Sequence, residues 1–384
     1  MKKIYLFAIS LFAGVLVLTS CKDDNEKNPG GQTGTNLYDI DYSSANAQNW
    51  GEYMLRVSAL LKNDAQTLYD DWVTSYNGGA PFSAIFKTHN TSAYPSAFSC
   101  IEQILDGCAD IANEVGDAKI KDPYDYYVSG DVTKALYAVE SWYSWHSRED
   151  YSNNIISIRN AYYGTRDGSV SPNSISALIS ANDAARDADI VAAITGAYNK
   201  ILAIPQPFRN HIVCAESEEA MEACLALEVK LDNLKSYIRT NLSQDPKLDA
   251  IITTYVDDVV IPTYADLKDR TAALYNACAA FKSAPGNQAF EECADKWMLA
   301  RTPWETSEAF LFGPVDSEGL DPNMDSWPLD QVAIVNILTS GDFSDMDWSA
   351  GDSEAEITAA QNVRGFHTLE FLIFKNGNPR SINN

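Results

Sequence analysis

The stretch GFHTLEFLIF, residues 365–374, places a histidine and a glutamate three positions apart in an otherwise apolar run. Three residues make nearly one helical turn, so His367 and Glu370 are predicted to point from one face of a buried, central helix. A buried unpaired carboxylate is unfavourable by on the order of several kcal/mol, so Glu370 needs a proton, a cationic partner or a metal ion. A simple buried His–Glu hydrogen bond satisfies the same spacing, and the residues alone leave both interpretations open.

The ends of this helix are predicted from capping signals. Ser353 followed by Glu356 is a capping-box signature, and the turn sequence Asn376-Gly377 is typical of a helix end. The pattern predicts one helix over residues 354–375.

Helical periodicity runs through most of the chain. In residues 49–75, Met54, Val57, Leu61 and Leu68 recur along one stripe. Similar patterns cover residues 94–118, 131–146, 149–163, 172–202, 217–243, 246–281 and 286–312, whereas strand-like alternation is scarce. The sequence therefore predicts an all-α protein built from four-helix-bundle-like domains with short and medium connections.

The first residues have the pattern of a bacterial lipoprotein signal peptide. A basic start, MKK, precedes a 15-residue apolar segment and the sequence TSC, which ends at Cys21. We expect removal of residues 1–20 and acylation of Cys21, with an ordinary secretory signal as the alternative. Residues 21–44 are polar and glycine-rich, which predicts a flexible tether. The KDD after Cys21 resembles the acidic export signal of surface lipoproteins, so an outer membrane lipoprotein at the cell surface is expected, with a periplasm-facing anchor as the alternative.

The chain is strongly acidic, with 28 lysines and arginines against 53 aspartates and glutamates and a formal net charge of −25. Such a charge repels nucleic acid and anionic membrane surfaces and favours cationic ligands. The solubility of an exported protein accounts for most of this charge without any ligand.

Six cysteines follow Cys21, and they form three couples that are close in sequence. In a chain exported to an oxidising compartment we expect three local disulfides, with free buried thiols as the alternative. The expected pairs are Cys100–Cys108, Cys214–Cys224 and Cys278–Cys293.

Gly365, His367 and Glu370 form the motif GxHxxE, and the surrounding segment resembles the motif helix of the imelysin-like proteins. Two upstream stretches, WMLARTPWETSEAFLFGPVD at residues 297–316 and SWPLD at residues 326–330, resemble the segments that precede this motif in the family. The resemblance implies two all-helical bundle domains with a site where they meet. Imelysin-like proteins were first described as metallopeptidases and are also linked to bacterial iron uptake.

Other stretches that resemble the family occur in an unusual order. Residues 140–164 resemble a stretch that lies well after the motif in imelysins, and residues 49–75 resemble the helix that directly follows it, yet both precede it here. This order predicts a circular permutation, which chain ends close together at the surface make tolerable. A plain split near residue 205 is the alternative to the expected domains, which are residues 76–245 and residues 48–75 plus 246–384.

The upstream stretch supplies further candidate site residues. On a helix, Arg301 and Glu305 share one face with two indoles, and Arg301 is the natural cation for Glu370 or for an anionic ligand. Pro303 also fits a helix start, which would move Arg301 off that face. We expect His367 and Glu370 to bind metal. The expected ligand-binding residues are Arg301, Glu305, Glu308, Asp316, Trp327 and Gly365.

The motif carries too few groups for a zinc peptidase, which needs about three protein ligands, an open position and a general base. If Glu370 binds the metal, the motif provides no base. We therefore expect a lipoprotein that captures iron, or an iron-bearing compound, between its domains and has iron-transport components as partners. The alternatives are a metallopeptidase of the imelysin type and an interaction scaffold without a small ligand.

Overall fold

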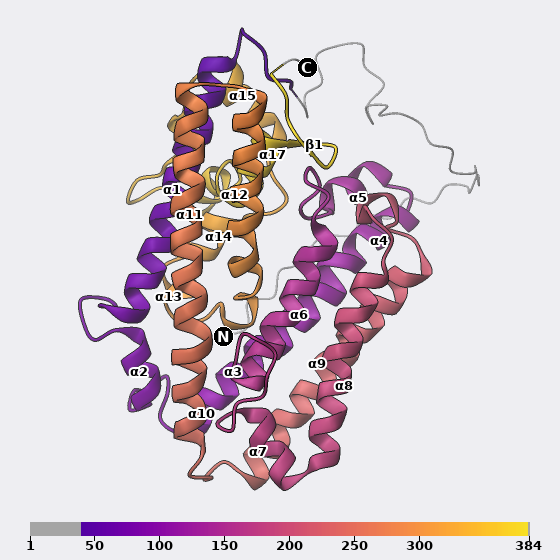
Figure 1. Ribbon diagram of the computed structural model, residues 1–384, viewed down its shortest axis with the longest axis vertical. Helices are drawn as coiled ribbons and strands as arrows, with labels where there is room; N and C mark the ends of the chain where they lie inside the picture. Colours follow the sequence, from indigo (N-terminus) through magenta and orange to yellow (C-terminus); the bar gives the residue numbers. More distant parts are fainter. Residues whose placement is uncertain (1–39, 383–384) are drawn as a thin grey trace. The chain divides into compact units, whose positions relative to one another are not determined.

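A computed structural model describes residues 40–382, which belong to one compact unit and are helical almost throughout (Figure 1). The prediction of an all-α protein is confirmed. Within residues 40–382, no helix is both long enough and apolar enough to cross a membrane. The predicted signal peptide, Cys21 and most of the predicted tether lie outside the described residues.

One group of helices carries the motif. It contains α1 (Ala47–Val73), α11 (Ile261–Ser283), α12 (Asn287–Glu305) and α17 (Gly365–Ile373), and α11 is preceded by α10 (Leu248–Thr254) and the π-helix η3 (Tyr255–Val260). In Figure 1, α1 packs along α11 and against α17, and α12 packs against both α11 and α17. The apolar stripe predicted for residues 49–75 is buried in these contacts. Trp50 and Tyr53 of α1 donate hydrogen bonds to the carbonyl oxygens of Leu372 and Val363, at 3.0 and 2.8 Å.

A second group consists of α3 (Ala97–Asn113), α6 (Ser147–Tyr163), α8 (Ala184–Ala203) and α9 (Ala215–Asn241), with the π-helix η1 (Glu114–Lys121) extending α3. Both α3 and α8 pack along α9, and α6 packs against α3 and α8.

The shorter elements are α2 (Phe82–Thr88), α4 (Asp122–Val128), α5 (Val132–Ala138), α7 (Ile175–Asn182), η2 (Phe208–Asn210), η4 (Glu308–Phe310), α13 (Pro314–Ser317), α14 (Leu320–Asp325), α15 (Gln331–Ser340), η5 (Ser344–Met346), α16 (Glu354–Gln361), β1 (Phe374–Lys375) and β2 (Asn378–Pro379).

The two groups meet where α6 lies against α12 and η4. Asn154 Nδ2 donates to Glu305 Oε2 at 2.6 Å, and the Ala309 backbone N–H donates to Ser157 Oγ at 3.0 Å. Gly107 of α3 allows this approach, because a Cβ atom there would lie 3.1 Å from the carbonyl carbon of Ala309. These contacts hold the C-terminal half of α12, which carries the candidate site residues, against the second group.

The two ends of the described chain lie close together. Lys375 Nζ is 2.7 Å from Asp41 Oδ1, and Arg380 Nη1 donates to the Ile40 carbonyl oxygen at 3.0 Å. Helix α1 also packs against α17, although the two helices are far apart in sequence. The circular permutation and the division into two domains stay predictions.

The segment predicted as one helix over residues 354–375 is two helices. The capping box of Ser353 and Glu356 is present, but it caps α16, which ends at Gln361. Helix α17 starts at Gly365, and after Ile373 the chain forms a hairpin in which β1 pairs antiparallel with β2. Gly365 has a φ of +83°, a conformation that glycine adopts without strain. The predicted boundary was wrong because a tertiary contact of Gly365, described below, decides where the motif helix begins.

The segment predicted as a helix over residues 131–146 also ends early. Helix α5 stops at Ala138, and residues 139–146 form an irregular turn in which Ser141 and Trp145 have positive φ values of 51° and 62°. This turn carries Glu140 and Ser144 into the candidate site, so its fold depends on long-range contacts that helical periodicity does not report.

Helix α12 runs through Pro303 without a break. Proline has no N–H to donate to the carbonyl oxygen one turn back, which belongs to Leu299. Arg270 Nη1 of α11 donates to that oxygen instead, at 2.9 Å. The alternative of a helix start at this proline is therefore wrong. Arg301 and Glu305 share one face, with Nη2 and Oε1 2.6 Å apart.

The six cysteines of the described residues are free thiols, so the three predicted disulfides are not formed. Cys100 and Cys108 lie on one straight helix, where eight residues separate Cα atoms by roughly 12 Å, beyond the reach of a disulfide. Cys224 likewise lies three turns along α9, with Cys214 at the start of that helix. Among the described cysteines, only Cys278 and Cys293, on neighbouring helices, are in contact: a hydrogen bond from the Cys293 thiol to Cys278, together with burial, raises the pKa of Cys293.

A buried carboxylate in α1 gives the fold a pH dependence. Burial, with Glu318 and Asp70 nearby, raises the pKa of Asp71 to about 6. Because this value lies above the ordinary aspartate value, the folded state holds the proton more tightly than the unfolded chain does. Asp71 therefore destabilises the fold progressively as the pH rises from about 4 to about 6, and the full penalty is present above that interval.

We expect Asp71→Asn to raise the free energy of unfolding by about 1 kcal/mol at about pH 7.5 and by much less at about pH 4.5. Urea denaturation at both pH values measures the difference. Asp269→Asn, on an exposed position of α11, is the matched control and should change little at either pH. An equal gain for Asp71→Asn at both pH values would contradict the assignment.

Candidate functional site

Gly365 packs the start of the motif helix onto the end of α14. A Cβ atom at Gly365 would lie 2.8 Å from the carbonyl carbon of Met324 and 3.1 Å from the carbonyl oxygen of Asn323. Only glycine allows this approach at a positive φ. The contact brings the next residue of α14, Asp325, beside His367. Gly365 thus contributes close backbone packing, and its predicted role in ligand binding stays a prediction.

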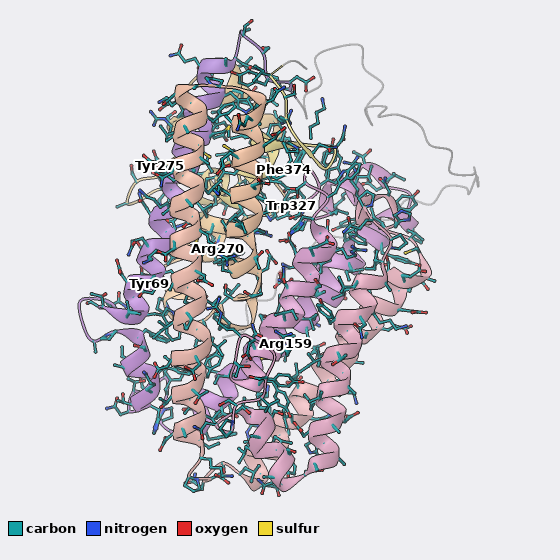
Figure 2. All side chains as sticks on the ribbon, viewed as in Figure 1. Tyr69, Arg159, Arg270, Tyr275, Trp327 and Phe374 are labelled. Carbon is teal, nitrogen blue, oxygen red and sulfur yellow. The ribbon has the colours of Figure 1, made fainter. Side chains whose placement is uncertain are left out.

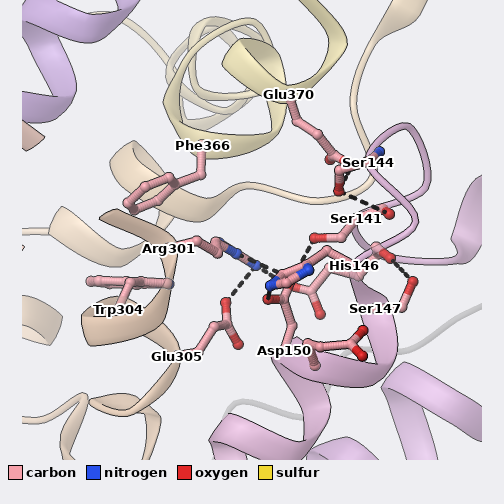
Figure 3. Close-up of polar contacts among 12 residues, drawn as sticks. Ser141, Ser144, His146, Ser147, Asp150, Arg301, Trp304, Glu305, Phe366 and Glu370 are labelled. Atoms are coloured by element: carbon pink, nitrogen blue, oxygen red, sulfur yellow. Dashed lines mark hydrogen bonds and ion pairs between the residues drawn. The ribbon is translucent and has the colours of Figure 1, made fainter. Parts of the chain in front are cut away.

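Glu370 is fully buried, and its carboxylate anchors the turn before α6. Oε1 accepts hydrogen bonds from the Tyr143 N–H at 2.9 Å, the Ser144 N–H at 2.7 Å and the Ser144 hydroxyl at 2.7 Å. Figure 3 shows Glu370 beside Ser144. Oε2 faces His367 Nδ1 at 3.2 Å. These partners satisfy the buried carboxylate without a metal ion. In this arrangement both oxygens of Glu370 are engaged, and its role as a metal ligand stays a prediction.

His367 presents its other ring nitrogen to two carboxylates. Nε2 lies 3.0 Å from Asp325 Oδ1 and 3.3 Å from Glu140 Oε1, and the side chain is fully buried. Burial and the Arg301 guanidinium lower the pKa of His367, but Asp325 and Glu140 outweigh both and hold it well above its ordinary value. The Trp327 ring, labelled in Figure 2, covers this imidazole at 4.8 Å between ring centres.

Arg301 of α12 lies fully buried among four carboxylates. Nη2 is 2.7 Å from Glu140 Oε1 and 2.6 Å from Glu305 Oε1. Nε is 3.4 Å from Asp150 Oδ2, and Figure 3 shows Arg301 between Asp150 and Glu305. Nη1 bonds Asp325 Oδ1. Burial lowers the pKa of Arg301, but Asp325 and Glu305 raise it well above its usual range, so the guanidinium stays charged. The prediction that Arg301 pairs with Glu370 is wrong, because the guanidinium pairs with these four groups.

Further charged groups surround this centre. Lys119 Nζ of η1 is 3.1 Å from Glu140 Oε2. Burial raises the pKa of Glu140, but Lys119, His367 and Arg301 lower it to about 2. Burial raises the pKa of Glu308 well above its ordinary value, and burial with Asp325 raises the pKa of Asp321 to about 7. Glu140 is therefore ionised at neutral pH, whereas burial favours the protonated form of Glu308.

Two overlapping sets of side chains could hold a metal ion. Glu140, Asp325 and His367 each offer one ligand atom, and these atoms lie within 4.8 Å of one another. Glu305, Glu308 and Asp325 form the second set with the same spacing. The first set combines an imidazole with two carboxylates, which suits iron, manganese or zinc. The second set offers oxygen alone, which suits harder cations such as magnesium or manganese.

The structure brings most of the predicted site residues together: Arg301, Glu305, Glu308, Trp327, His367 and Glu370. Asp316 does not join them. Gly313, with a φ of +69°, turns the chain so that Pro314 and Val315 are buried and Asp316 is exposed on α13. Asp316 therefore lies outside the cluster, and its predicted role in ligand binding stays a prediction.

The sequence prediction missed four charged groups of the site: Lys119, Glu140, Asp150 and Asp325. Asp150 lies inside the recognised stretch 140–164, and two others lie at the edges of recognised segments. Glu140 is the first residue of the stretch 140–164, and Asp325 directly precedes SWPLD. An acidic residue at the edge of each segment was the available signal. Lys119 had no such signal, because it reaches the site from a π-helix.

The model of the imelysin family (Peptidase_M75) matches residues 26–234 and 260–383, which is most of the chain. The chain therefore belongs to the imelysin family.

The chain is similar in sequence to two proteins of known name. An imelysin peptidase from Bacteroides ovatus, known from a crystal structure, is 56% identical in sequence to this chain. The two structures superpose with a TM-score of 0.89, and the alignment covers 90% of this chain and 99% of that one. The iron-regulated protein A of Synechococcus elongatus is 32% identical over 135 residues. That alignment spans 33% of this chain and 32% of the relative, about a third of each.

Proposed function

We propose that this protein binds a metal ion, with iron as its physiological cargo, at the set formed by Glu140, Asp325 and His367. The observation that carries the proposal is the convergence of three ligand atoms within 4.8 Å from three separate parts of the chain. An imidazole with two carboxylates is a donor set that iron accepts readily. Glu370 contributes by holding the imidazole through Nδ1, as a supporting carboxylate does for many metal-binding histidines.

The family supports iron as the cargo. A relative over part of the chain bears the name iron-regulated protein A. The strongly negative chain, with a formal net charge of −25, raises the local concentration of cations. Both facts are compatible with free iron and with an iron-bearing compound as the cargo.

We further propose that the protein is an outer membrane lipoprotein anchored through Cys21, that its body faces the cell surface, and that it delivers its cargo to iron-transport components. The signal-like segment, the polar tether and the acidic KDD after Cys21 support this location. Cys21→Ser is expected to release the protein from the membrane fraction of the bacterial cell. Retention of that variant in membranes, with the same detergent requirement as the unaltered protein, would contradict the anchor.

Peptidase activity fits the site less well. Glu370 is engaged by the turn before α6, so it does not serve as a general base. We expect no hydrolysis of an unfolded protein substrate in the presence of zinc. Zinc-dependent turnover that is lost in His367→Ala would overturn this choice.

Metal binding is tested by titrating the protein with Mn²⁺ and, without oxygen, with Fe²⁺, using calorimetry. We expect His367→Ala and Asp325→Asn each to weaken binding at least about tenfold, because each removes one of three ligands, and tenfold corresponds to about 1.4 kcal/mol. Asp316→Asn is the matched control, since it removes an exposed carboxylate outside the cluster.

Two results separate the outcomes of that titration. Equal binding by the unaltered protein, His367→Ala and Asp325→Asn would remove the cluster from the role. Tight binding of ferric citrate by a protein that ignores Fe²⁺ would show that the cargo is an iron compound rather than the bare ion. Circular dichroism of each variant establishes that it remains folded.

A further inference from the structure

The guanidinium of Arg301 lies against the same atoms that the proposed metal ion needs. Nη2 is 2.7 Å from Glu140 Oε1 and 3.3 Å from His367 Nε2, and Nη1 bonds Asp325 Oδ1. A cation and its ligands require this space to themselves, because a metal ion and a guanidinium next to each other repel strongly in a buried site.

The site contains more carboxylates than cationic side chains. Within residues 40–382, no hydrogen bond or ion pair reaches the carboxylate of Glu308, although this residue is only 6% exposed and faces Glu305 and Asp325. Among the lysines and arginines of residues 40–382, Lys119 and Arg301 are the ones that pair with carboxylates of the site. Both already contact Glu140.

We propose that Arg301 is a built-in competitor for the metal ion: its guanidinium neutralises the carboxylates of the empty site, and a metal ion binds by displacing it from Glu140, Asp325 and His367. This inference rests on the proposed metal binding and adds how that binding is regulated. The internal cation keeps the buried carboxylates from repelling each other when no metal is present. It also lowers the affinity of the site, because part of the binding free energy breaks the existing ion pairs.

The same geometry decides which class of ligand the site takes. All three guanidinium nitrogens already face carboxylates, so an anionic iron complex would have to compete with four negative groups for Arg301. A bare divalent cation, by contrast, binds the carboxylates directly once the guanidinium has left them. The site therefore selects a bare cation over an anionic complex.

Arg301→Gln removes the competing charge and keeps a polar side chain of related shape. We expect this variant to bind Mn²⁺ at least tenfold more tightly than the unaltered protein, and to gain more thermal stability from added Mn²⁺. Arg301→Lys keeps one charge but reaches fewer of the four carboxylates, so its affinity should fall between the two. Arg239→Gln makes the same charge change at an exposed ion pair on α9 and should leave Mn²⁺ binding unaltered.

Each outcome of this titration is decisive. If Arg301→Gln is folded and binds Mn²⁺ no more tightly than the unaltered protein, Arg301 is not a competitor, and metal binding itself still stands. If the unaltered protein binds no Mn²⁺ but Arg301→Gln does, the proposed function fails and the competition is supported. If Arg301→Gln folds only with Mn²⁺ present, competition is supported, and Arg301→Lys then measures its strength. Absence of binding by all three proteins overturns both proposals.

Discussion

Glu370→Ala is expected to lower the free energy of unfolding by about 3–5 kcal/mol. The substitution removes the acceptor of three hydrogen bonds and leaves the Tyr143 and Ser144 N–H groups buried without their partner. It also leaves His367 Nδ1 without the carboxylate at 3.2 Å. Because the turn of residues 139–146 depends on this anchor, Glu140 should lose its place in the site as well.

Urea denaturation of Glu370→Ala, Glu370→Gln and the unaltered protein measures this effect. Glu370→Gln keeps one carbonyl acceptor and should lose about half as much stability. Glu291→Ala, at an exposed position of α12, is the control and should change the free energy of unfolding by less than about 0.5 kcal/mol. A loss below about 1 kcal/mol for Glu370→Ala would show that the turn is held by other contacts.

Gly365→Ala is expected to destabilise the fold by about 3 kcal/mol or more, and to weaken Mn²⁺ binding in the variant that still folds. A methyl group here meets the Met324 carbonyl group at a backbone φ of +83°, so α14 and α17 must move apart. That movement separates Asp325 from His367, which are 3.0 Å apart in the structure.

A matched glycine separates this effect from a general response to alanine. Gly196 lies inside α8, and nothing lies within 4 Å of a Cβ atom built there. Gly196→Ala should therefore stabilise the protein by about 0.5–1 kcal/mol, because alanine is the better helix former. Thermal denaturation compares the two variants. If both shift the melting temperature in the same direction and by similar amounts, the packing account of Gly365 fails.

Local sequence patterns predicted the parts of the fold that depend on local causes. The stripe in residues 49–75 has the period of a helix, and α1 buries it as expected. The capping box at Ser353 is present because its partners lie three residues apart. The face of α12 with Arg301 and Glu305 was also predicted, although the continuity of that helix depends on Arg270, which replaces the missing donor of Pro303.

Long-range contacts decided what the patterns missed. The buried charge of Glu370 required a partner, but the partner proved to be the backbone of Tyr143 and Ser144, 226 or more residues away in sequence. Nothing local in that segment identifies two amide groups as an anion site. The start of α17 was missed for the same kind of reason, since a neighbouring carbonyl group from α14 decides it.

The cysteine pairs failed for a geometric reason. Closeness in sequence favours a disulfide in a loop, but on one straight helix it separates the thiols along the axis. Only the couple on two neighbouring helices, Cys278 and Cys293, came into contact.

Anomalous X-ray diffraction from crystals of the unaltered protein grown with Mn²⁺ tests the central claim most directly. The account predicts an anomalous peak in contact with His367 Nε2 and with carboxylate oxygens of Glu140 and Asp325, and a guanidinium of Arg301 that has left these atoms. Crystals in which Mn²⁺ binds only at other positions, with Arg301 still among its four carboxylates, would contradict it.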